Sequence, residues 1–203
     1  MFTTYDIVIA PFCIFLLWLV AVSKTKKYDP VTAKLFLNAF KFKIFCAVAF
    51  TFVTAFYYGG GDSEMFFYAV KDMRQAIAND DLSYLQLVKM ESTDENSPLA
   101  YYFELDDTKY PVAGFMRSSS NFLVPKLALI PAVIFFNSYL SICLVFSFFA
   151  LGGAIRLYKM FLHYFPTMRR EAALVTLFLP SVCYWSSGFL KDSICFGSMG
   201  FLL

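Results

Sequence analysis

The sequence predicts an all-α polytopic membrane protein, a helical bundle whose first outer loop is long and partly helical. Hydrophobic residues make up 59% of the 203 positions, against about 45–50% in ordinary globular domains. They are gathered in long runs, which is typical of transmembrane helices. Basic residues are concentrated in two of the connections between these runs, as expected for loops on one side of a membrane.

The apolar runs divide the chain into three regions. Residues 1–58 contain two spans, 7–23 and 44–58, the second with a start as early as residue 36, and a basic cytoplasmic loop between them. Residues 59–125 form an extracytoplasmic loop with short interfacial helices. Residues 126–203 contain span three (126–151), span four (172–185) and part of a fifth (194–203). A span needs about 20 residues, so the ten-residue last run predicts an N-terminal fragment; a short re-entrant terminus is the alternative.

Lysine and arginine predict the orientation of these spans. The positive-inside rule places connections rich in these residues in the cytoplasm, so the N-terminus, the 59–125 loop and the 186–193 turn are expected outside. We therefore expect an integral membrane protein with its N-terminus outside. The first connection contains Lys24, Lys26, Lys27, Lys34, Lys41 and Lys43, and the third contains Arg156, Lys159, Arg169 and Arg170.

The stretch 57–68, YYGGGDSEMFFY, is the main candidate for an active site. Its three glycines are expected to stop a helix and to turn the chain tightly. Asp62 and Glu64 follow at once, where a carboxylate can act as a general base or hold a divalent cation such as Mg²⁺ or Mn²⁺. The alternative is that Asp62 caps the helix that follows. Tyr58 belongs to an outer group of aromatic residues that suits a membrane interface first and sugar stacking second.

Two further polar stretches lie on the same predicted side and provide candidate substrate-binding residues. The turn 186–193, SSGFLKDS, contains Ser187, Lys191 and Asp192, and its lysine can hold a phosphate as a point charge. The alternative is an interfacial lysine beside a helix-capping aspartate. The stretch 117–121 offers Arg117 and Asn121 for phosphate or sugar hydroxyls, or it is an ordinary polar approach to span three.

A second span that leads directly to an acid in a long, partly helical outer loop resembles the GT-C class of polytopic glycosyltransferases. The stretch 180–193, PSVCYWSSGFLKDS, is similar to a signature of bacterial membrane proteins of this kind and of polysaccharide polymerases. The resemblance implies transfer of a sugar from a polyprenyl-phosphate-linked donor, within the membrane lipid, to an acceptor on the outer face. It also implies that Asp62 is the base or metal ligand and that Glu64 assists it.

Two other classes remain open at this stage. One is a non-catalytic membrane assembly protein, in which Asp62 has no catalytic role. The other is a transporter or flippase subunit of cell-envelope polysaccharide export, which should place polar or charged groups in mid-membrane. No Walker loop, dinucleotide fingerprint or nucleic-acid module occurs in the sequence, so we expect no nucleic-acid partner. The sequence predicts no oligomeric state.

Overall fold

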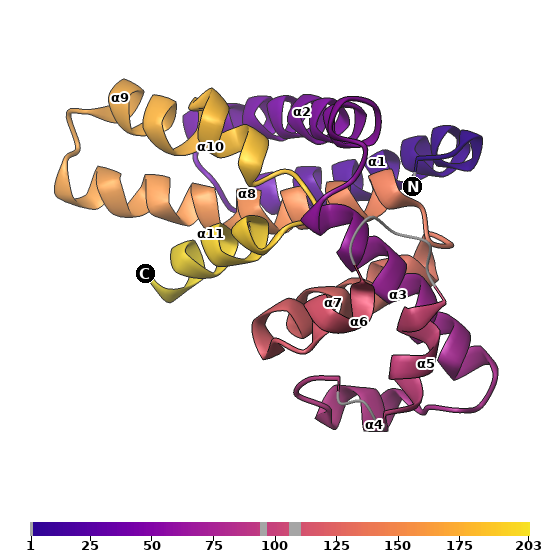
Figure 1. Cartoon of the computed structure of the whole chain (residues 1–203). Helices are drawn as coiled ribbons and strands as arrows, with labels where there is room; N and C mark the ends of the chain where they lie inside the picture. The colour runs from indigo at the N-terminus through magenta and orange to yellow at the C-terminus, as the bar shows by residue number, and fades with distance from the viewer. Residues whose placement is uncertain (1, 94–96, 106–110) are drawn as a thin grey trace.

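The structure is a computed structural model that describes residues 2–93, 97–105 and 111–203, and every regular element in these ranges is a helix (Figure 1). The elements are α1 (Thr4–Thr25), α2 (Pro30–Phe52), the π-helical turn η1 (Val53–Tyr58), α3 (Asp62–Ala78), α4 (Tyr84–Lys89), α5 (Pro98–Glu104), α6 (Val112–Met116), α7 (Ser119–Ile134), α8 (Tyr139–Tyr164), α9 (Arg169–Ala173), the π-helical turn η2 (Leu174–Phe178), α10 (Pro180–Trp185) and α11 (Lys191–Leu202).

Three helices among the described residues are long and apolar enough to cross a membrane: Thr4–Thr25, Pro30–Tyr58 and Tyr139–Tyr164. The helical fold and the presence of helices that are long and apolar enough to cross a membrane agree with the sequence prediction. Helix α8 is the central one, because it packs against α1, α2 and α11. The N-terminal ends of α1 and α8 touch each other, so these two helices run parallel and α2 runs antiparallel to them.

The first basic connection is shorter than the sequence predicted. Helix α2 starts at Pro30 because Asp29 accepts a hydrogen bond from the Thr32 backbone N–H (3.1 Å), and proline is well suited to the first helical position. The second apolar helix therefore runs from residue 30 to residue 58, rather than from 44 or 36. Lys34, Lys41 and Lys43, which the sequence predicts in the cytoplasmic loop, lie inside this helix.

The predicted third span, 126–151, is two helices in the structure. Helix α7 ends at Ile134, and Phe136 and Asn137 adopt left-handed backbone conformations (φ 53° and 61°). The Ser138 hydroxyl then caps α8 by accepting from the Ser141 N–H (3.2 Å). Hydropathy does not reveal this break, because the residues on both sides of it are apolar.

The predicted fourth and fifth spans are short and interrupted. The segment 169–185 consists of α9, η2 and α10, with a break at Leu179 before Pro180, which has no N–H to continue the helical pattern. Helix α11 packs closely on α8: a Cβ built on Gly153 would lie 2.4 Å from the Gly197 carbonyl oxygen. This contact depends on glycine in both helices, as in other small-residue packing in membranes.

Residues of the predicted outer loop fold with α7 into a helical unit that lies beside the bundle and shares an apolar core with α2 and α8 (Figure 1). Helices α3, α5, α6 and α7 share an apolar core that includes Phe66, Met73, Phe103, Met116 and Phe122. The short helices predicted for this loop are present in the described residues as α3, α4, α5 and α6. Parts of the predicted loop, 94–96 and 106–110, lie outside the described residues.

Helix α7 contributes one face to this core and leaves an opposite apolar face uncovered. Leu123, Leu127, Ile130 and Ile134 are all exposed and are spaced by four, three and four residues, which places them on one side of the helix. An exposed apolar stripe of this kind is suited to contact with membrane lipid. The unit therefore packs its apolar core against the bundle and also has a surface that fits the predicted interfacial position.

A buried carboxylate joins the parallel ends of α1 and α8. Asp6 is only 1% exposed, and its side chain accepts from the Thr3 N–H (2.8 Å), the Ser138 hydroxyl (2.7 Å) and the Leu140 N–H (3.1 Å). Both helix N-termini have positive dipole ends and unpaired N–H groups, so one anion stabilises two helices.

We predict that Asp6→Ala lowers the unfolding free energy in detergent by about 2–4 kcal/mol, because two buried donors on α8 and one on α1 lose their acceptor. Asp6→Asn should retain part of that stability. Glu171→Ala removes an exposed acid from the first turn of α9 and serves as the control, with an expected change within about 0.5 kcal/mol. Equal losses in Asp6→Ala and the control would contradict this role.

Candidate functional site

A pocket of about 380 Å³ lies where the π-helical end of α2, the start of α3 and the α10–α11 connection meet. It brings together residues more than 120 positions apart, from the glycine–acid turn and from the 184–192 stretch. The lining residues are Phe50, Thr54, Tyr58, Gly59, Gly60, Gly61, Asp62, Ser63, Tyr184, Trp185, Leu190 and Asp192.

The glycine turn has the tight geometry predicted from sequence. Gly59, Gly60 and Gly61 all have positive φ (62°, 129° and 104°), and Gly59 ends the helix in the left-handed conformation. A Cβ built on Gly60 would lie 2.0 Å from a Glu64 carboxylate oxygen, so the Glu64 side chain folds back over this glycine. Burial raises the pKa of the Glu64 carboxyl above its ordinary value.

The structure does not support helix capping as the role of Asp62. Gly61 occupies the N-cap position of α3, Asp62 is the first helical residue, and no side chain caps this end. Asp62 is exposed and lines the pocket. The carboxylate is therefore available to other partners.

Asp192 is the second acid of the pocket, on the first turn of α11. The first turns of α3 and α11 both contribute to the pocket, and neither has a side-chain cap. Backbone N–H groups at such ends favour anions. Next to them lie the aromatic rings of Tyr58, Tyr184 and Trp185. The pocket thus combines carboxylates that can accept a proton, helix ends that can hold a phosphate and rings on which a sugar can stack.

Of the residues proposed from sequence, the pocket brings together Asp62, Tyr58 and Asp192. Lys191 instead donates to the Ser120 hydroxyl at the start of α7 (3.1 Å), next to the pocket. Asn121 donates to the Phe115 carbonyl at the end of α6 (2.7 Å). The lining of this pocket includes neither of these two residues nor Glu64, Arg117 or Ser187.

Ser187 has a role inside the bundle. Its hydroxyl is fully buried and pairs with that of Ser147 on α8 (3.1 Å). Arg117 lies exposed just after α6. Among residues 2–93, 97–105 and 111–203, no group of three or more His, Cys, Asp or Glu side chains is placed to hold a metal. A divalent cation at Asp62 and Glu64 therefore stays a prediction.

Lys43 was predicted in the first cytoplasmic connection, but it lies inside α2 and contacts the helix that precedes the pocket. It is 2% exposed in the middle of α2, and its ammonium group donates to the Ser186 carbonyl (3.0 Å), the Cys183 carbonyl (3.4 Å) and the Ser186 hydroxyl. It therefore neutralises the negative end of α10, the short helix that presents Tyr184 and Trp185 to the pocket. The sequence did contain a signal for this role, because Lys43 directly precedes an apolar run and a lysine buried in such a helix needs a polar partner inside the protein.

We predict that Lys43→Met lowers the unfolding free energy in detergent by about 1–3 kcal/mol, since the end of α10 loses its buried donor. Relief of the cost of burying an amine limits the loss. Lys41→Met, two residues earlier on an exposed position of the same helix, is the matched control and should change stability by less than about 0.5 kcal/mol. If Lys43→Met is as stable as the control, the lysine does not anchor α10.

Comparison with known proteins adds no relative: no family model, no curated protein and no solved structure matches this chain.

Proposed function

We propose that the protein is a membrane glycosyltransferase that moves a sugar from a polyprenyl-phosphate-linked donor to an acceptor on the extracytoplasmic face. The observation that supports this most directly is the shared pocket of Asp62 and Asp192. The two stretches that resemble the GT-C class, 57–68 and 180–193, are separated by more than 100 residues and line the same pocket. A common site explains why these two stretches line the same pocket better than chance does.

In the proposed reaction, Asp62 takes the proton of the acceptor hydroxyl. The acceptor oxygen forms a bond to the anomeric carbon, and the bond from that carbon to the phosphate oxygen breaks. Polyprenyl phosphate leaves with the negative charge. The uncapped first turns of α3 and α11 stabilise that charge, and Lys191 lies beside them. A divalent cation at Asp62 and Glu64 would supply further charge stabilisation when bound.

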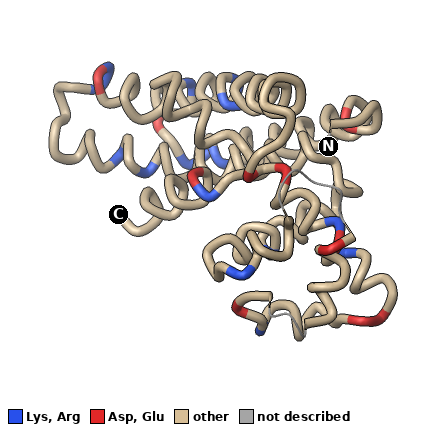
Figure 2. Tube along the Cα trace, in the orientation of Figure 1, with Lys and Arg blue, Asp and Glu red and all other residues tan. Residues whose placement is uncertain are grey.

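The proposed orientation rests on the charges at the two ends of the bundle. Figure 2 shows that Lys and Arg on the bundle helices lie mostly toward the end at which α9 is found. The end that meets α3 is the opposite one (Figure 1), and the start of α3 lines the pocket. By the positive-inside rule, the α9 end faces the cytoplasm of a bacterial cell, and the N-terminus and the pocket lie outside.

Labelling of single cysteines in intact cells tests this orientation. In a Cys195→Ser background, Thr167→Cys next to α9 should resist a membrane-impermeant thiol reagent, and Gln75→Cys on α3 should react. Both positions are exposed, so the difference reports the membrane and not burial. The reverse pattern would show that the orientation is the opposite of the one proposed. Labelling of both positions would show that no membrane separates them.

We predict that Asp62→Asn reduces sugar transfer from a polyprenyl-phosphate-sugar by about 10²–10⁴-fold at unchanged protein level, the range for loss of a general base. Glu91→Gln, an exposed acid on the same outer unit and outside the pocket, is the control and should keep full activity. Lys191→Ala should weaken donor binding more than it lowers stability. Full activity of Asp62→Asn would rule out its role as base.

A transporter or flippase subunit is the second candidate, and the observation that favours it is Lys43. A buried cation in the middle of an apolar helix, near Ser147 and Ser187, is the kind of mid-membrane group that transport requires. The variants separate the two: a transporter should lose transport in Lys43→Met and keep it in Asp62→Asn. A non-catalytic assembly protein should retain function in Asp62→Asn and show no transfer.

A further inference from the structure

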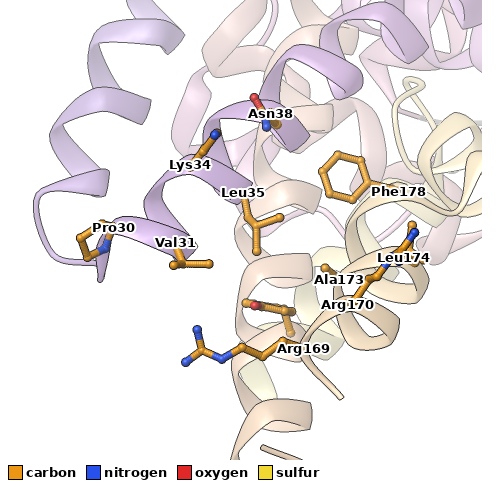
Figure 3. Close-up of a pocket in the computed structure, with 11 residues that line it drawn as sticks. Pro30, Val31, Lys34, Leu35, Asn38, Arg169, Arg170, Ala173, Leu174 and Phe178 are labelled. Atoms are coloured by element: carbon orange, nitrogen blue, oxygen red, sulfur yellow. The ribbon is translucent and has the colours of Figure 1, made fainter. Parts of the chain in front are cut away.

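A groove of about 700 Å³ lies at the basic end of the bundle, between the start of α2 and the α9–η2 segment (Figure 3). It shares no lining residue with the pocket of Asp62. The lining residues are Pro30, Val31, Lys34, Leu35, Asn38, Tyr158, Arg169, Arg170, Ala173, Leu174 and Phe178.

The charged residues of this lining are all cations: Lys34 from α2, and Arg169 and Arg170 from α9. In Figure 3, Arg169 extends from α9 toward Val31 at the start of α2. Two carboxylates lie near these cations, and one of them, Asp29, interacts with Arg169. Asp29 caps α2, and its hydrogen bonds with Thr32, followed by the charge of Arg169, lower the pKa of its carboxyl. Glu171 lines a different groove, with Phe161 and Met168.

A buried hydroxyl in the same lining has no partner. Tyr158 on α8 is 0% exposed, and its phenolic OH makes no hydrogen bond with any described residue. Buried polar groups in native proteins are nearly always paired, so an orphaned hydroxyl in a groove with three cations indicates an absent acceptor. Phosphate oxygens accept hydrogen bonds from both guanidinium and hydroxyl groups.

The rest of the groove is apolar and partly open. Val31 on α2 and Leu174 on η2 are more than half exposed, and Leu35 and Phe178 lie between them. The groove thus has a cationic part at the end of the bundle. Its apolar wall runs along α2, which belongs to a helix long and apolar enough to cross a membrane. A ligand that matches both parts has an anionic head and a hydrocarbon tail.

We propose that this groove binds one anionic phospholipid of the membrane leaflet at the α9 end. The phosphate binds Arg169 and accepts a hydrogen bond from the Tyr158 hydroxyl, and Lys34 and Arg170 are further cations of the same lining. One acyl chain follows the wall of Val31, Leu35 and Leu174. This proposal depends on membrane insertion of the bundle and not on glycosyl transfer, so either can fail without the other.

The test is lipid retention by the purified full chain in a neutral detergent, measured by native mass spectrometry after addition of phosphatidylglycerol or phosphatidylcholine. The wild type should retain phosphatidylglycerol preferentially. Arg169→Gln with Arg170→Gln should weaken that retention about 25-fold, at about fivefold for each cation. Lys26→Gln with Lys27→Gln makes the same charge change at the same end of the bundle but outside the groove, and should leave retention unchanged.

Tyr158→Phe separates the specific site from general attraction to basic residues. It deletes only the unpartnered hydroxyl, so the melting temperature without lipid should not fall, and phosphatidylglycerol retention should drop about tenfold, as for a hydrogen bond to a charged group. Equal retention of the two lipids, equal losses in the two double variants, or an unaffected Tyr158→Phe would overturn the proposal. So would displacement of phosphatidylglycerol by inorganic phosphate alone, or a dimer of this chain that covers the groove.

Discussion

The structure depends on the requirement that polar groups inside an apolar helical bundle be paired within the chain, because lipid offers them no hydrogen bonds. The bundle is built from helices that end inside it as well as from helices long enough to cross a membrane. Each internal end leaves N–H or carbonyl groups unpaired. Asp6 resolves this for the N-termini of α1 and α8, and Lys43 resolves it for the C-terminus of α10. Anion and cation each occupy the helix end whose dipole favours it.

The candidate site follows from the same broken helices. Helix α2 ends in a π-helical turn and three glycines with positive φ, and α10 ends shortly before α11 begins. These interruptions place the uncapped first turns of α3 and α11 at one pocket, with Asp62 and Asp192 on them. If these helices were continuous, Asp62 and Asp192 would not lie at the same pocket. Lys43 therefore contributes to the site indirectly, because it fixes the helix that presents Tyr184 and Trp185.

The two ends of the bundle have different chemistry. One end combines exposed acids, aromatic rings and a helical unit that packs against the bundle and has an apolar stripe on α7. The other end combines Lys34, Arg169 and Arg170 with an orphaned tyrosine hydroxyl above an apolar wall. The first arrangement suits a lipid-linked sugar at a membrane surface, and the second suits the headgroup of a lipid that stays in its leaflet.

The sequence by itself determined the helical class, the apolar helices and the glycine turn before Asp62, because these depend on local composition and on the backbone freedom of glycine. It also indicated Asp62, Tyr58 and Asp192, through short local patterns. It did not determine the break at Phe136–Asn137 or the true place of Lys43, because hydropathy averages over a window and does not register a single left-handed residue or a buried amine. Only the tertiary structure decided that Ser187 faces Ser147 rather than a substrate pocket, and that Lys191 turns to Ser120. Those choices depend on which helices pack together, and a partner 40 or more residues away cannot be predicted from the residues that flank a side chain in the sequence.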